Sequence, residues 1–121
     1  MGFKWKDYHS ALILSLMRDR PSIWDKRVME YRNKTVKDAA MDEIIREINI
    51  PGLTMRELKM KIKSIRTRYS AELKRVIQRS NGGPEYVPRL FWFKLADSFL
   101  RAVCVPRISV SFVRQKEVPS L

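Results

Sequence analysis

The sequence predicts an all-α fold, a three-helix bundle with a short C-terminal helical segment packed across it. Apolar residues recur every three or four positions in three separate stretches, which is the period of an amphipathic helix. Proline and glycine signals at Pro21, at Pro51-Gly52 and at 81–84 separate these stretches from one another and from the C-terminal part. A chain of 121 residues, of which 45% are hydrophobic, can bury one core but not two separate ones.

The first helix is expected over about residues 7–20. Asp7 is a suitable N-cap residue. Pro21 disfavours the helical conformation at Arg20, so the helix should end there. One apolar stripe runs along the helix and consists of Leu12, Ile13, Leu16 and Met17.

The second helix is expected over about residues 36–48, and Pro51-Gly52 terminates it. Its apolar stripe consists of Ala40, Met41, Ile44, Ile45 and Ile48. Its outer face is acidic, with a net charge of −2 from Asp38, Asp42, Glu43 and Glu47 against Lys37 and Arg46. Such a face is suited to a protein partner.

The third helix is the longest, at about residues 55–79. Thr54 and Glu57 have the spacing of a capping box, in which each side chain binds the other residue's backbone amide. The sequence Asn-Gly-Gly-Pro at 81–84 is a turn that ends the helix. The apolar stripe consists of Leu58, Ile62, Ile65, Tyr69, Leu73 and Val76.

Three regions are expected along the chain: an N-terminal arm at 1–7, one folded domain at 8–101 and a tail at 102–121. The apolar segment at 90–100 is interpreted as a short fourth helix, or a turn, that covers the bundle. Residues 108–112 alternate like a strand, but a lone strand is unstable. The tail is therefore either disordered or adds a strand to a partner's sheet, and its removal should leave folding intact.

The charge indicates a polyanionic partner. The sequence has 25 Lys and Arg against 13 Asp and Glu, a net charge of +12 with a pI near 10.3. That balance favours nucleic acid or an anionic membrane surface. No apolar run approaches the roughly 20 residues of a membrane helix, so no membrane partner is expected. More than half of the charge, +7, lies within residues 54–79.

The cations of the third helix lie on two flanks, at about 100° per residue. Opposite the apolar stripe lie Met60, Ser64, Thr67 and Ala71, and one flank holds Lys61, Arg68, Arg75 and Arg79. A slim face between basic flanks suits a DNA groove, with bases in front of it and phosphates on either side. The alternative is a solvated basic helix. The predicted contacts with double-stranded DNA are the other flank, Arg56, Lys59, Lys63, Arg66 and Lys74, together with Ser64 and Thr67 near the bases.

Arg66 has a second interpretation, because it borders the apolar stripe. Its guanidinium is also expected to be able to pair with Glu43 or Glu47 of the second helix. In that arrangement Arg66 would stabilise the fold as well as contact DNA.

The residue types present argue against an enzyme. With one cysteine, Cys104, and one histidine, His9, the chain can build neither an internal disulfide nor a zinc cluster, and we expect an intracellular protein. No catalytic constellation and no glycine-rich phosphate loop are visible. We therefore expect no catalysis, no cofactor, no bound metal and no small-molecule substrate.

The aromatic residues are expected in the core. They occupy stripe or turn positions, which favours packing over base stacking. Trp5, between Lys4 and Lys6, could instead belong to an arm that reaches a minor groove or a phosphate, although an unstructured terminus is the favoured interpretation. The predicted core aromatics are Trp24, Tyr31, Tyr69, Trp92, Phe93 and Phe99.

Four segments resemble the MADF domain, a Myb/SANT-like module of transcription regulators. Residues 18–25, R-D-R-P-S-I-W-D, are similar to its R-x-R-P-x-L-[YW]-D turn, and residues 31–34, Y-R-N-K, to its Y-K-N. Residues 58–69, L-K-M-K-I-K-S-I-R-T-R-Y, are similar to L-K-x-K-W-K-x-L-R-D-x-Y. The segment at 90–100 is similar to the family's W-x-[FY]…F-L ending, at Trp92-Phe93 and Ser98-Phe99-Leu100.

The resemblance covers about residues 8–101 and implies sequence-directed DNA binding through the third helix, in a nuclear regulator of transcription or chromatin. Met41 and Ile62 stand where the family usually has tryptophan, and these apolar substitutes can still pack in a core. Some modules of this kind instead recruit chromatin or transcription-machinery proteins. A binder of histone tails should present acidic residues, whereas the third helix here carries +7.

Overall fold

The computed structural model describes residues 4–79 and 86–104, and every regular element in these ranges is a helix. The all-α prediction is therefore confirmed, although there are more helical elements than the predicted three and a covering segment. In chain order they are α1 (Asp7–Arg18), α2 (Pro21–Trp24), the 3₁₀ helix η1 (Met29–Arg32), α3 (Lys34–Ile48), α4 (Met55–Arg79) and α5 (Phe93–Leu100).

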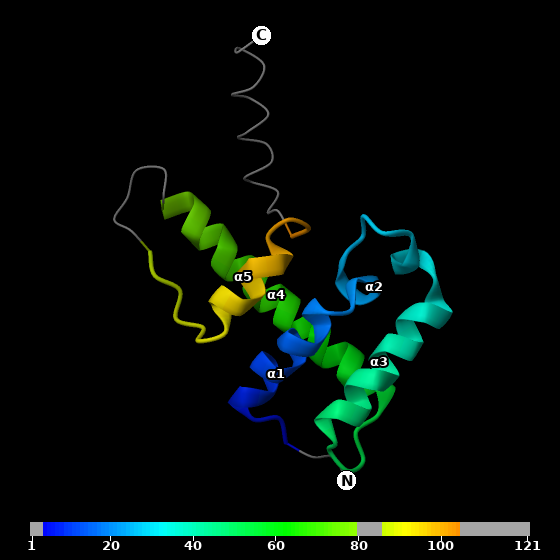
Figure 1. Cartoon of the computed structure of the whole chain (residues 1–121). Coiled ribbons are helices and arrows are strands. Elements are labelled where there is room, and N and C mark those ends of the chain that lie inside the picture. The colour runs from blue at the N-terminus through cyan, green and yellow to red at the C-terminus, as the bar shows by residue number, and fades with distance from the viewer. Residues whose placement is uncertain (1–3, 80–85, 105–121) are drawn as a thin grey trace.

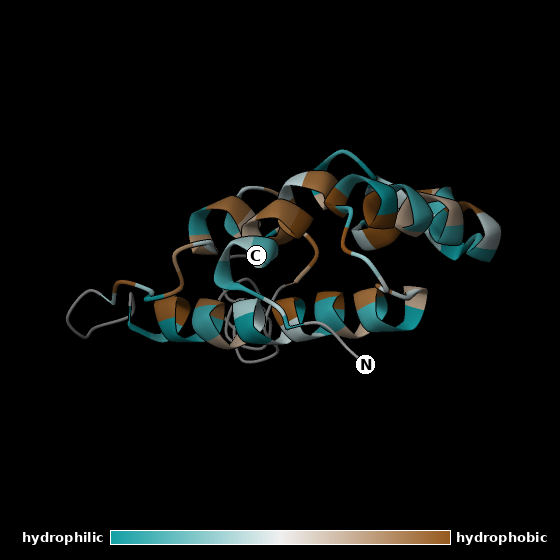
Figure 2. Ribbon diagram, turned by 90° about the horizontal axis from the view of Figure 1, so that it is seen from below, coloured by the Kyte–Doolittle hydropathy of each residue, from teal (hydrophilic) through white to brown (hydrophobic). Residues whose placement is uncertain are grey.

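The helices form two layers around one core. The long helix α4 is one layer, and the remaining helices lie across its apolar side (Figures 1 and 2). Within the second layer, α1 lies between α3 and α5 and packs against both. The side chains between the layers are buried along most of α4, from Leu58 to Leu73. This arrangement leaves the opposite side of α4 free of other described helices.

The start and the buried face of α1 differ from the prediction. Lys6, not Asp7, is the N-cap residue, and its backbone amide donates to Nδ1 of the buried His9 at 2.9 Å. The fully buried residues are Ile13, Leu14 and Met17, whereas the predicted Leu12 is 36% exposed. Because residues 11–14 and 16–17 are all apolar, the pattern has too little polar contrast to orient the stripe.

Two short elements between α1 and α3 were not predicted. Pro21 ends the first run, as expected, but it is also the first residue of α2, where its fixed φ suits a helix start. Trp24 then folds back on α1 through a 2.8 Å hydrogen bond from its Nε1 to the carbonyl oxygen of Met17. Its ring also meets Phe99 of α5 edge-on at 4.9 Å. Four-residue helices leave no periodic signal to read in a sequence.

The N-termini of α3 and α4 follow side-chain caps. Asn33 Oδ1 accepts from the backbone amide of Val36 at 3.2 Å, so α3 begins at Lys34, earlier than predicted. The capping box of α4 is confirmed: the Glu57 amide donates to Thr54 Oγ1 at 3.2 Å, and the Thr54 amide donates to Glu57 Oε1 at 3.1 Å. The apolar stripes predicted for α3 and α4 are buried, apart from half-buried Ile45 and Val76.

The C-terminal segment is a helix, α5, that packs against α1 and α4. The Tyr69 hydroxyl of α4 donates to Asp97 Oδ1 of α5 at 2.6 Å. Beyond α5, Val103 is buried and Cys104 half-buried, so these two residues still pack on the bundle. The predicted turn at 81–84, the strand-like stretch at 108–112 and the tail from residue 105 onward lie outside the described residues.

Most of the predicted core aromatics are buried. Tyr31 is the exception, because it lies half-buried in η1 with Lys37 Nζ 3.9 Å from its ring centre. Trp5 does not fit an unstructured terminus: it is half-buried and packs against the core. Met41 and Ile62 are buried, as expected of core positions. The confirmed aromatic core residues are Trp24, Tyr69, Trp92, Phe93 and Phe99.

Candidate nucleic-acid interface

The outer face of α4 is open to solvent along the helix. Met60 is 62% exposed, and Ser64, Thr67 and Ala71 are also exposed. The polar side of α4 faces away from the layer formed by the other helices (Figure 2). A partner can therefore reach this face along its length without displacing any described element.

The seven predicted DNA contacts all lie on α4, and six of them are exposed. Arg66 is the exception, since it is half-buried and its Nη2 lies 3.8 Å from Cys104 Sγ. The alternative pairing of Arg66 with Glu43 or Glu47 is not formed: no ion pair joins Arg66 to either residue, and Glu43 accepts instead from Arg20 Nε at 2.9 Å. The exposed six are Arg56, Lys59, Lys63, Ser64, Thr67 and Lys74.

Four of the seven line one concavity of about 630 Å³ between α4 and the elements from α2 to α3. We call it the basic groove. Its floor is apolar and includes Ile23, Met41 and Ile62. Arg56, Ser64 and Lys74 do not line it. Its polar rim includes Tyr31, Lys37, Lys59, Lys63, Arg66, Thr67 and Ser70.

Two rim residues, Tyr31 and Lys37, were not among the predicted contacts. They come from η1 and α3 and reach the groove because α3 packs against α4 and η1 packs against α3. The Y-R-N-K motif marked Tyr31 as notable, but its place in the groove depends on the packing of α3. No pattern local to residues 31–37 shows that packing.

The cations that line the basic groove differ in how far nearby acidic groups neutralise them. Asp38 of α3 accepts from Lys34 Nζ at 2.8 Å and lies 3.1 Å from Lys59 Nζ. These hydrogen bonds, the one from Lys34 first, hold the pKa of the Asp38 carboxyl below its usual range. Among the described residues, no acidic group pairs with Lys63. Lys63 is therefore the cation of the groove most available to an external anion.

The described residues form neither a metal-binding cluster nor a membrane-spanning helix. Over residues 4–79 and 86–104, no group of three or more histidine, cysteine, aspartate or glutamate side chains is placed to hold a metal ion. In the same ranges, no helix has the length and apolar character that crossing a membrane requires.

The comparison with known families matches most of the chain. The model of the MADF DNA-binding family, described as "Alcohol dehydrogenase transcription factor Myb/SANT-like", matches residues 13–100. No curated protein and no solved structure matches significantly. The match runs from within α1 to the end of α5 and includes all of α4. The chain therefore belongs to the MADF family of Myb/SANT-like DNA-binding domains.

Proposed function

We propose that the chain binds duplex DNA by placing α4 in the major groove, as part of a nuclear regulator of transcription or chromatin. The observation that carries the proposal is the concentration of positive charge on the uncovered helix. Its nine basic and two acidic residues give α4 a net charge of +7, and its outer face is open. In this proposal the chain acts by binding DNA and not by catalysis.

The dimensions of the helix support this placement. An α-helix with its side chains is roughly 10–12 Å across, and the major groove is about 12 Å wide. With Ser64 and Thr67 facing the bases, Lys63 and Lys74 on one flank lie beside a sugar–phosphate strand. Hydroxyl groups donate to or accept from base edges, whereas lysines contact phosphates without regard to sequence.

The test is a charge reversal on the exposed flank, Lys63→Glu, with random-sequence duplex DNA titrated at several salt concentrations. We expect roughly tenfold weaker binding at low salt and a salt slope lower by about 0.9, because one phosphate contact is lost. The matched control is Arg46→Glu, which makes the same charge change at an exposed position on α3. The control should bind DNA nearly as the parent does.

The result also separates this proposal from a protein-interaction function. If Lys63→Glu folds normally and binds DNA as tightly as Arg46→Glu does, the exposed face of α4 is not the DNA surface. Recruitment of a protein partner then becomes the leading function, and the acidic outer face of α3 is the first surface to examine.

A further inference from the structure

A second groove lies on the other flank of α4, away from the basic groove. It has a volume of about 200 Å³ and is formed where the N-terminal segment and the segment before α5 meet α4. We call it the arm groove. None of its residues was among the seven predicted contact residues, although Lys61 and Arg68 belong to the second basic flank of α4. The residues that matter here are Trp5, Lys6, Asp7, Lys61, Arg68 and Arg89.

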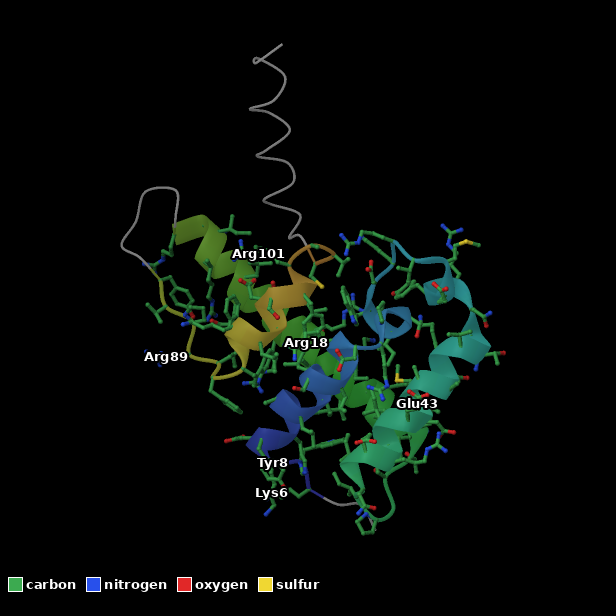
Figure 3. The ribbon with its side chains drawn as sticks, in the orientation of Figure 1. Lys6, Tyr8, Arg18, Glu43, Arg89 and Arg101 are labelled. Carbon is green, nitrogen blue, oxygen red and sulfur yellow. The ribbon has the colours of Figure 1, made fainter. Side chains whose placement is uncertain are left out.

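Three segments distant in the sequence supply its cations. Lys6 precedes α1, Lys61 and Arg68 lie two turns apart on α4, and Arg89 lies in the segment that leads to α5. Figure 3 shows Lys6 and Arg89 on the side of the molecule where α1 begins and the chain approaches α5. The N-terminal segment is held in place there, because the half-buried Trp5 ring lies 5.5 Å from Lys61 Nζ and meets His9 edge-on.

The positive charge of the arm groove is poorly compensated. Four cations line it, and Asp7 is the single acidic residue among the described residues that do so. No described acidic group pairs with Arg68 or Arg89. Burial, followed by repulsion from Arg68, lowers the pKa of Lys61. An external anion would relieve this repulsion.

We propose that the arm groove binds backbone phosphate of the DNA strand opposite to the one that the basic groove faces. The inference rests on the proposed function and adds Lys6 and Arg89 as DNA-contacting residues outside α4. Lys61 and Arg68 lie on the flank of α4 opposite Lys59 and Lys63, so a helix seated in the major groove directs the two sets toward different strands. One arginine guanidinium can donate two hydrogen bonds to two oxygens of the same phosphate, so Arg68 and Arg89 are suited to bind backbone phosphate.

The test compares Arg89→Glu with Arg18→Glu, an equal charge change at an exposed residue of α1 in the layer that covers α4 (Figure 3). With random-sequence duplex DNA, we expect Arg89→Glu to bind roughly tenfold more weakly at low salt. Its salt slope should fall by about 0.9, whereas the slope of Arg18→Glu should not change. Arg89→Ala should show the same slope change with a smaller loss of affinity. Thermal melting of each variant checks that it folds.

The outcomes separate this inference from the proposed function. If Lys63→Glu weakens binding and Arg89→Glu matches Arg18→Glu, the arm groove does not contact DNA although α4 does. If Arg89→Glu and Lys63→Glu both weaken binding, the double variant should lose the product of the two factors, as expected for independent contacts on two strands. If neither variant weakens binding, the proposed function fails together with this inference.

Free phosphate is the other source of the same chemistry. Inorganic phosphate is therefore titrated against the whole chain, with the side-chain resonances of Arg68 and Arg89 as the readout. Saturation at low millimolar phosphate, combined with unchanged DNA binding by Arg89→Glu, would assign the groove to a free anion and overturn the proposal. Weak, non-saturating shifts together with the loss of DNA affinity support backbone phosphate as the ligand.

Discussion

Helices α3 and α4 are built alike on their inner faces and oppositely on their outer faces. Each buries an apolar stripe that repeats every three or four residues, with Ile44 on α3 and Leu73 on α4 fully buried. On its outer side α3 carries more acidic than basic residues, whereas α4 carries nine basic residues and two acidic ones. The two helices pack against each other, so both outer faces border the same small domain.

The comparison separates the requirements of folding from those of binding. The free energy of folding depends on burial of the inner stripes. It does not depend on whether the outer face of each helix is acidic or basic. The self-repulsion of nine cations on one helix opposes folding by a small amount. A helix that keeps this charge on an uncovered face is suited to a polyanion, and its acidic neighbour is not.

The largest expected effect is on the inner faces, where the two helices should behave alike. Ile44→Ala and Leu73→Ala each remove a fully buried aliphatic side chain. We expect each to lower the free energy of unfolding by about 2–5 kcal/mol, from lost burial and the cavity left behind. Urea denaturation measures both. If one variant lost less than about 1 kcal/mol, the stripe of that helix would not be part of a shared core.

How much of this fold the sequence predicts depends on polar contrast along each helix. In α4, charged residues separate the stripe positions and the Thr54–Glu57 box marks the start, so both bounds and the buried face were predicted correctly. In α1 the apolar run around Leu12 and Leu14 offers two possible stripes, and packing between α3 and α5 selects the one that contains Leu14.

The candidate site was predictable only where it lies on a single helix. The flank positions of Lys63 and Lys74 follow from helical geometry alone. The neighbour of Arg66 does not, because Cys104 reaches it only after the chain has turned beyond α5. Likewise, Lys6 and Arg89 join the α4 cations through contacts between segments far apart in the sequence.

A second prediction concerns a polar contact that distinguishes the two inner faces. The residues that α3 buries are all apolar, whereas the fully buried Tyr69 of α4 donates to Asp97. We expect Tyr69→Phe to lower the free energy of unfolding by about 1–2 kcal/mol at pH 7. This range lies below that of a fully buried bond to a charged group because the Asp97 side chain is 26% exposed to solvent. Urea denaturation again provides the measurement.

The same contact makes stability depend on alkaline pH. Burial, then the bond to Asp97, raises the pKa of Tyr69 far above its usual value. An unfolded tyrosine ionises near pH 10, whereas the folded one stays protonated. The stabilisation from Tyr69 is therefore complete below about pH 10 and decreases as the pH rises further. Between pH 8 and pH 10.5, the free energy of unfolding should fall more steeply for the parent than for Tyr69→Phe. Equal slopes would contradict the assignment of this pH dependence to Tyr69.

The helix caps give a smaller effect that again compares α3 with α4. Asn33→Ala removes one side-chain acceptor from the start of α3. Thr54→Ala removes the acceptor for the Glu57 amide and also a hydroxyl that donates to Glu57 Oε1. Each loss should be about 0.5–2 kcal/mol, with Thr54→Ala the larger. Thermal melting checks the order, and Thr54→Ser should restore most of the stability because serine keeps the hydroxyl.

The smallest expected effect is a charge reversal on the outer face of α3. Asp42 is exposed there and forms no ion pair with another described residue, so Asp42→Lys should leave the fold intact. The substitution raises the net charge by two, yet at about 0.15 M salt the Debye length is only about 8 Å. DNA affinity should therefore change by less than about twofold, and should rise only at low salt.

This variant tests whether the placement of charge or its total amount governs DNA binding. Lys63→Glu and Asp42→Lys change the net charge by equal and opposite amounts, on α4 and α3 respectively. If the total governed, titrations with the same duplex at 0.15 M salt would give changes of similar size and opposite sign. We expect a large loss for Lys63→Glu and almost none for Asp42→Lys, because in the proposed complex the outer face of α4 touches phosphate and the outer face of α3 does not. A strong gain for Asp42→Lys at that salt would mean that DNA also approaches α3, and the contrast between the two outer faces would no longer identify the binding surface.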